Sequence, residues 1–353
     1  MIKLKNQIIN SIYTATNNLS YSKKECSLAP PKNTEFGDLC SNIALLLAKD
    51  LKESPLEIAN NIVNELNSIS NENIVSISVT KPGFINFKIK GHYFQSKIKD
   101  ILDKNQKYGK GSIGIGKTAN VEFVSANPTG PLTVGHGRNA IIGDTVSNIL
   151  EWQGYSVTRE YYFNNAGRQM RILAQSVEAR YFELLGHDLE LPQDGYQGQY
   201  IINIAQSILN QKGKRLKSGD PIFKSIAEDT MFDKIKYSLE ELKIYFDHFT
   251  NEKTFYENGD IEKFMDELKG KNLIYEKENA TWFRATSLGK EQDRVYIKST
   301  GEPTYRVPDT AYHRDKINRK YDLIIDVFGA DHADAYPDVI CALEALGHDT
   351  SHI

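Results

Sequence analysis

The spacing of apolar positions in residues 1–110 is typical of a small α+β domain. Apolar residues recur with helical spacing in four stretches, at about 3–18, 39–52, 56–67 and 93–106. Two further stretches, ENIVSISVT and FINFKIK, alternate apolar and polar residues, and Lys81-Pro82-Gly83 lies between them where a tight turn is needed. The pattern predicts helices around a strand pair, followed by a glycine-rich linker at 109–112.

A different pattern begins near residue 118. VEFVSA is an apolar strand of the buried type, NPTGPLTVG is a loop, and a helix begins at His136. The predicted inner face of this helix is Ile142, Val146, Ile149 and Leu150. Gly154 ends the helix and SVTREYYF is the next strand, so the unit predicts a parallel sheet with crossover helices.

The rest of the chain extends this sheet after a long helical interruption. Residues 166–271 are mostly helical and polar. The apolar strand DLIIDVFGADH follows, with a last helix that opens at Pro337. We therefore predict an α/β fold: a Rossmann-like parallel-sheet domain over 111–353, with an insertion at about 190–290, preceded by the α+β domain of 1–110.

Composition indicates an ordered globular protein of a reducing compartment. Of its 353 residues, 40% are hydrophobic and 25% are charged, which excludes a wholly disordered chain. No apolar run approaches the roughly 18–20 residues of a membrane span, and the N-terminus lacks the apolar segment of an export signal. Cys26, Cys40 and Cys341 form no Cys-x-x-Cys pair, so we expect a cytoplasmic protein without disulfides or a zinc site.

The net charge of −3 hides an asymmetry along the chain. Residues 1–120 have a balance of +6, whereas residues 121–353 have a balance of −9. Two interpretations remain open. The excess is an ordinary solvated surface, or the N-terminal domain meets a polyanion.

Two glycine-rich segments compete as nucleotide-binding loops. GSIGIGKT at 111–118 has the spacing of a phosphate loop, but such a loop follows a strand and opens a helix, and here the order is reversed. We interpret it as a linker. Gly135, Gly137 and Ala140 fit a dinucleotide fingerprint, with Glu160 about 20 residues further on. The loop with two prolines that precedes it argues against this fit, and a NAD-type enzyme remains an alternative.

The whole loop 126–136 supports a third interpretation. It brings small residues and a histidine to the start of a helix, where N–H groups and the helix dipole favour anions. The Gly135 backbone allows a base or ribose to approach closely, and His136 is suited to donate to a phosphate that gains charge during attack. A structural alternative, in which His136 only caps the helix, remains open.

The segment VEFVSANPTGPLTVGHGRNAIIGD resembles the signature of class I aminoacyl-tRNA synthetases, and in detail that of arginyl-tRNA synthetases. The class motif His-Ile-Gly-His reads Thr-Val-Gly-His here, so Thr133 stands in place of the first histidine. REYYFNNAGRQM, GEPTYRVPDTAYHRDK and VFGADHADAYPDV resemble later segments of the family in the same order. PKNTEFGDLCSNIALLLAK and KPGFINFKI resemble its N-terminal domain, so the resemblance covers nearly all of 30–350.

The resemblance implies a ligase that uses ATP to activate L-arginine as arginyl-adenylate and then transfers arginine to tRNA(Arg). Mg²⁺ accompanies ATP in this view, the protein has no metal site of its own, and it is a monomer that binds no DNA and no membrane. The catalytic residues implied are Thr133, Gly135 and His136. The ATP-binding residues implied are Pro128, Gly130, Thr133, Gly135, His136 and Asp331. The arginine-binding residues implied are Glu122, Ser125, Asn127, Tyr305, Asp309 and His332.

The chemistry of arginine agrees with this assignment. A guanidinium presents five donors in a planar fork, so a selective pocket needs paired acceptors. The resemblance gives that task to Glu122, Tyr305 and Asp309, and gives the α-amino group to Ser125 and Asn127. Apart from the resemblance, Glu122 lies in an otherwise apolar strand and needs a polar partner, whereas Asp309 has an ordinary alternative as a first-turn acid of a helix.

One element of the family is missing from the sequence. The class also carries a Lys-Met-Ser-Lys signature whose lysine meets the pyrophosphate, and no such segment occurs. We therefore expect an N-terminal portion of a synthetase, with an incomplete catalytic domain and no anticodon-binding domain. A non-catalytic tRNA-binding paralogue remains a further alternative.

Overall fold

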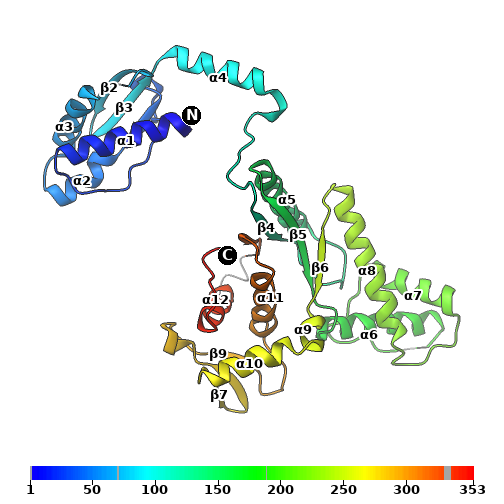
Figure 1. The fold of residues 1–353 in the computed structure, drawn as a ribbon. Helices are drawn as coiled ribbons and strands as arrows, with labels where there is room; N and C mark the ends of the chain where they lie inside the picture. Colours follow the sequence, from blue (N-terminus) through cyan, green and yellow to red (C-terminus); the bar gives the residue numbers. More distant parts are fainter. Residues whose placement is uncertain (1, 70, 188, 330–334) are drawn as a thin grey trace. The chain divides into compact units, whose positions relative to one another are not determined.

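The computed structural model describes residues 2–69, 71–187, 189–329 and 335–353. It divides into two compact units, Met1–Tyr108 and Gly109–Ile353 (Figure 1). Each unit has its own buried core.

The N-terminal unit packs helices against a three-stranded antiparallel sheet of order β1-β3-β2. Its strands are β1 (Leu39–Ser41), β2 (Ile74–Thr80) and β3 (Phe84–Ile89), and its helices are α1 (Ile2–Asn18), α2 (Ile43–Leu51), α3 (Pro55–Ser68) and α4 (Gly91–Lys104). Two short 3-10 turns are η1 (Thr34–Phe36) and η2 (Asn105–Lys107). The predicted strand pair is confirmed. The helix predicted over 39–52 is wrong at its start, because Leu39 and Ser41 alternate into the core as a strand that pairs with β3.

The second unit is built on a parallel sheet of order β10-β4-β5-β6, which confirms the predicted α/β fold. The strands are β4 (Thr118–Glu122), β5 (Ser156–Phe163), β6 (His248–Asn251) and β10 (Leu323–Asp326). Helix α5 (Val134–Trp152) makes the crossover from β4 to β5. Val121 and Tyr161 join the apolar cluster that includes α5, whereas Glu122 and Glu160 alternate to the opposite face.

The inner face of α5 differs from the prediction. Ile142 and Ile149 are 42% and 57% exposed, and the buried residues of the helix are Ala140, Gly143 and Ser147. A Cβ built on Gly143 would lie 2.1 Å from Cγ of Phe123. Val146 and Leu150 pack against the core as predicted, whereas Ile142 and Ile149 do not. The helix makes its closest approach to the sheet through its small residues, which the periodicity of large apolar residues does not reveal.

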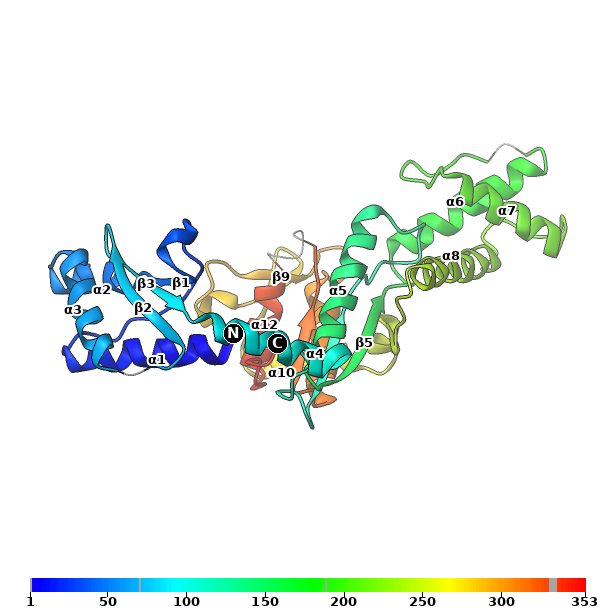
Figure 2. The same ribbon diagram turned by 90° about the horizontal axis from the view of Figure 1, so that it is seen from above.

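The segment between β5 and α11 forms two substructures. Helices α6 (Arg168–Leu184), α7 (Gln199–Lys212) and α8 (Ile222–Glu241) pack side by side (Figures 1 and 2). The chain then enters β6, so the predicted insertion at 190–290 is not continuous: it contains a strand of the parallel sheet. The strand HFTN has only four residues, too few for a recognisable alternation.

After β6 the chain builds a small cap before it returns to the sheet. The cap comprises α9 (Lys253–Glu257), α10 (Asp260–Gly270), η3 (Ala285–Leu288) and the antiparallel strands β7 (Ile274–Lys277), β8 (Ala280–Phe283) and β9 (Arg294–Ile297). Helix α11 (Arg306–Asn318) then leads into β10, and α12 (Tyr336–Ala345) packs beside α11 (Figure 1).

Candidate active site

A strained turn follows β4 at the carboxyl edge of the sheet. The strand ends at Glu122, earlier than the predicted VEFVSA, because Val124 and Ser125 have positive φ angles of 65° and 45°. Such a conformation is costly for β-branched valine, so surrounding contacts must hold it. Asn139 does so: its Oδ1 accepts from the Val124 N–H at 2.7 Å and its Nδ2 donates to the Val327 carbonyl at 2.7 Å.

Glu122 is held inside this turn by two partners. Ser125 Oγ donates to Oε1 at 2.8 Å, and Lys316 Nζ donates to Oε2 at 2.5 Å. The polar partner that the sequence demanded is thus a lysine 194 residues away. Ser125 Oγ also accepts from the Tyr162 N–H at 3.2 Å, which ties the turn to β5.

Asn127 links the same loop to the segment that follows β5. Its Oδ1 accepts from the Asn164 N–H at 2.9 Å and its Nδ2 donates to Gln169 at 3.0 Å. The loop is anchored further along by Tyr200, whose hydroxyl donates to the Thr129 carbonyl at 3.0 Å. These bonds hold the predicted loop residues at the edge where open α/β sheets bind ligands.

Two more carboxylates face this edge. Asp309 lies in the first turn of α11, and no described residue forms a hydrogen bond with its carboxylate. Burial raises the pKa of Asp309 to about 7. Glu252, which the sequence patterns did not indicate, directly follows β6 and accepts from the Tyr162 hydroxyl at 2.9 Å and from Asn164 Nδ2 at 2.6 Å. Burial raises the pKa of Glu252 as well.

The phenol of Tyr162 is influenced by more than one of these carboxylates. Burial raises the pKa of its phenol well above the ordinary value, and the negative charges of Glu252 and Asp309 add to the effect. Its ring stacks on Tyr312 with centroids 4.3 Å apart. Glu252 was missed because its strand was missed, although it occupies the same position after a parallel strand as the turn after β4.

The structure does not bring every predicted arginine-binding residue into this cluster. Glu122 contacts Ser125, which bonds to the Tyr162 N–H, and the charge of Asp309 acts on the Tyr162 phenol, whereas Tyr305 is 74% exposed. Asp331 and His332 lie outside the described residues.

The signature helix begins with a reciprocal cap. Thr133 is the N-cap of α5; its backbone N–H donates to Nδ1 of His136 at 3.1 Å, and its Oγ1 accepts from the His136 N–H at 3.4 Å. His136 therefore does cap the helix. Because Nδ1 accepts a hydrogen bond, the proton of neutral imidazole resides on Nε2, which is left to donate outward. Capping and donation to a ligand are thus compatible.

The competing nucleotide motifs do not fit the structure. GSIGIGKT leads directly into β4 at Thr118, as predicted, and no helix follows it. Glu160 is fully buried in β5, where Arg319, Asn120 and Thr250 bind its carboxylate. It therefore has no carboxylate oxygen to offer a ribose, and the dinucleotide alternative loses its acidic residue.

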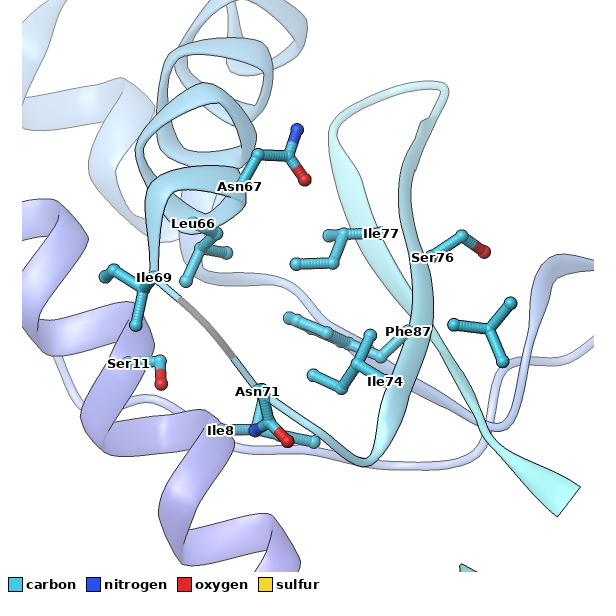
Figure 3. Close-up of a pocket in the computed structure, with 11 residues that line it drawn as sticks. Ile8, Ser11, Leu66, Asn67, Ile69, Asn71, Ile74, Ser76, Ile77 and Phe87 are labelled. Carbon is cyan, nitrogen blue, oxygen red and sulfur yellow. The ribbon is translucent and has the colours of Figure 1, made fainter. Parts of the chain in front are cut away.

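A separate pocket of about 180 Å³ lies in the N-terminal unit, between α1, the end of α3 and β2 (Figure 3). Buried Ile8, Leu66 and Phe87 line its inside, and Ser11 and Asn67 contribute polar groups. None of the described residues that line it is ionisable.

The described residues offer neither a ready-made metal site nor a membrane span. No group of three or more His, Cys, Asp or Glu side chains among them is arranged to hold a metal ion. No helix within the described ranges is long and apolar enough to cross a membrane.

The fold and the loop-to-helix signature match a family model described as "tRNA synthetases class I (R), catalytic domain" over residues 97–349. A second model, "Arginyl tRNA synthetase N terminal domain", matches residues 3–89. The chain therefore belongs to the class I tRNA synthetase family, in its arginyl-tRNA synthetase branch.

Known relatives agree with this membership. An arginine–tRNA ligase of Desulfotalea psychrophila is 47% identical over 325 residues, covering 92% of this chain and 59% of the relative. One of Salinibacter ruber is 44% identical over 348 residues, covering 93% and 62%. The Thermus thermophilus arginyl-tRNA synthetase structure shares the fold, with a TM-score of 0.69, 19% identity and coverage of 98% and 63%. The chain thus spans about 60% of the length of the curated relatives it matches.

Proposed function

We propose that this chain acts in the activation of L-arginine with ATP and in the transfer of arginine to tRNA(Arg). The observation that supports the proposal best is the presence of three carboxylates at this edge of the sheet: Glu122 at the end of β4, Glu252 after β6, where it accepts from the Tyr162 hydroxyl, and Asp309 in the first turn of α11. Lys316 is the cation that contacts Glu122, and neither Glu252 nor Asp309 forms an ion pair with a described residue. Such an excess of buried carboxylates suits a cationic ligand with several donors.

The proposed arginine site uses these groups for the guanidinium. Asp309 and Glu252 supply carboxylate oxygens that no described cation neutralises, and Glu122 contributes from the strained turn. Ser125 and Asn127 are proposed to hold the α-amino group. Tyr305 is proposed to close over the guanidinium from the surface, and His332 to meet the amino-acid backbone.

The proposed ATP site is the start of α5. His136 donates from Nε2 to the α-phosphate as charge develops there, and Thr133 holds the imidazole through its backbone N–H. A Cβ built on Gly135 would make only an ordinary van der Waals contact, 3.5 Å from Oγ1 of Thr133, and Pro128 and Gly130 lie in the loop before it. Asp331 is proposed to meet the adenosine. Mg²⁺ is proposed to enter with the phosphates, because the described residues contain no cluster of ligands for it.

In the proposed reaction an arginine carboxylate oxygen attacks the α-phosphorus and the bond to the β-phosphate breaks, which releases pyrophosphate. The side chains named here only bind, orient and donate hydrogen bonds. We further propose tRNA(Arg) as the partner of the basic N-terminal unit. A cytoplasmic monomer is also proposed, and the free state of Cys26, Cys40 and Cys341 supports the reducing location.

ATP–pyrophosphate exchange tests the proposal. The expected result is exchange that requires arginine and tRNA(Arg) and stays at background with lysine, whose ammonium cannot make the paired contacts of a guanidinium. Absence of exchange together with retained tRNA binding would favour the non-catalytic paralogue. Tight NADH binding would favour the dinucleotide enzyme.

Asp309→Ala is the matched test of the pocket. We expect arginine binding to weaken by about 2–5 kcal/mol, because a buried charge pair is broken, while ATP binding stays nearly unchanged. Asp315→Ala is the control, since this acid pairs with Arg319 on the same helix without contacting the pocket. Calorimetry measures both ligands, and equal losses for arginine and ATP would count against the pocket assignment.

A further inference from the structure

A row of three acids crosses the sheet beneath the candidate arginine site. Asp326, Glu122 and Glu160 are register partners on the adjacent strands β10, β4 and β5. The side chains of Glu122 and Asp326 are each 3% exposed, and that of Glu160 is fully buried. Buried carboxylates of this density require compensating cations.

Helix α11 supplies those cations at every third position. His313, Lys316 and Arg319 recur on one side of the helix. Arg319 binds Glu160 through both terminal nitrogens, at 2.9 and 3.0 Å. This bidentate pair occupies both carboxylate oxygens of Glu160, so we interpret it as a structural ion pair.

Lys316 is arranged differently, because its ammonium is shared. Nζ lies 2.5 Å from Glu122 Oε2 and 2.5 Å from Asp326 Oδ1, and the side chain has no exposed surface. Oε1 of Glu122 remains with Ser125 in the strained turn. The other oxygen of Asp326 contacts His313 Nε2 at 2.9 Å, and Nδ1 of that histidine lies 2.8 Å from the Asp309 carbonyl.

We propose that Lys316 is a positioning residue for amino-acid recognition: its shared ammonium holds Oε2 of Glu122, so that Oε1, beside Ser125, is turned to serve the bound amino acid. The inference rests on the proposed function and deepens it. The same chain of contacts, through Asp326 and His313, fixes the backbone of Asp309. Lys316 thus couples the acids contributed by β4 and by α11.

A variant that lacks the Lys316 ammonium tests whether this residue positions Glu122 or only stabilises the fold. Lys316→Met leaves Glu122 and Asp326 close together without their shared cation, so one of them takes up a proton. The charged groups that act on Glu122 besides Lys316 are His313 from α11 and Asp326 from β10, and Asp309 from α11 interacts with both Glu122 and Glu252. Since two carboxylates compete for one proton, arginine affinity should fall by about tenfold or more at pH 7 and recover as the pH rises.

A double variant, Lys316→Met with Asp326→Asn, removes one cation and one anion and so restores the charge balance. We expect its thermal midpoint to return toward that of the unaltered chain while arginine binding stays weakened and ATP binding is retained. Arg314→Met is the matched control, because it removes another cation of α11, one that pairs with Glu267 of α10 and does not touch the row of acids. Its arginine affinity should equal that of the unaltered chain.

The outcomes distinguish this inference from the proposed function. If the unaltered full chain shows no arginine binding in calorimetry, the proposed function fails. If it binds and either Lys316 variant binds arginine equally well with the same pH profile, the positioning role is overturned. If both Lys316 variants unfold while Arg314→Met stays folded, Lys316 is a purely structural residue and the inference is likewise overturned.

Discussion

The carboxyl group of Asp309 is expected to change its protonation state near neutral pH. Burial, together with the charges of Glu122 and Glu252 and against the opposing effect of His313, raises the pKa of its carboxyl to about 7. Without ligand, the folded chain therefore holds this proton better than the unfolded chain does. Stability contributed by Asp309 should fall as the pH rises from the ordinary value of 3.8 toward 7.

Arginine binding is expected to reverse that shift. A guanidinium beside the carboxylate favours its ionised form, so binding below pH 7 releases a proton, and affinity should rise up to about tenfold per pH unit before levelling off above 7. Calorimetry in two buffers of different ionisation enthalpy counts the proton. Asp309→Asn should flatten the profile, and a profile unchanged in that variant would assign the titration to another group.

Thr133 and His136 form the same helix cap, but we expect their substitutions to affect the rate of adenylate formation differently. Thr133→Ala removes a side-chain cap worth about 1 kcal/mol while the backbone bond to Nδ1 survives, so adenylate formation should change little. His136→Ala removes the proposed phosphate donor and should slow exchange about 10²–10³-fold. Pyrophosphate exchange at saturating substrates measures both, and equal effects would mean that His136 acts only through the cap.

At the scale of elements, sequence patterns predicted the helices, strands and sheet type better than they predicted which side chains contact each other. The strand pair around Lys81-Pro82-Gly83, the crossover unit and the parallel sheet followed from local periodicity. β6 was missed because four residues carry too little pattern. The inner face of α5 was predicted only in part: Val146 and Leu150 pack on the core, but the buried residues of the helix are small ones, which tight packing selects. The Glu122–Lys316 pair joins residues 194 positions apart, so it cannot be predicted from local sequence spacing.

The close approach of α5 to β4 gives a test with an internal control. Gly143→Ala places a Cβ 2.1 Å from Phe123, near the root of a ring that cannot swing away, so the helix must shift. We expect a loss of about 1–3 kcal/mol. Gly137→Ala meets nothing within 4 Å and should stabilise the same helix by up to about 1 kcal/mol. Thermal unfolding compares them, and equal midpoints would contradict the packing argument.

At the scale of the whole molecule, charge is distributed by unit. The acidic balance of 121–353 includes the buried acids of the sheet and the candidate arginine site, whereas the excess of lysine falls in the first 120 residues. Composition predicted this division, but not what the acids do, because pairing across the sheet depends on the fold. The excess of lysine in the N-terminal unit is not explained by ion pairs in the buried core of that unit, because this core is apolar.

If the N-terminal unit meets tRNA, its lysines should govern the salt dependence of binding. Lys3, Lys32 and Lys81 are exposed there, and none forms an ion pair with another described residue. Neutralising them to glutamine should weaken tRNA binding and reduce the slope of log K against log salt by roughly 0.7–0.9 for each phosphate that is no longer neutralised. Lys269→Gln with Lys271→Gln is the control, because these exposed lysines belong to the acidic unit. Filter binding at several salt concentrations measures the slope. A slope that stays unchanged in the N-terminal variants would leave their charge as an ordinary solvated surface, since counterion release requires that a phosphate actually replace the ions around each lysine.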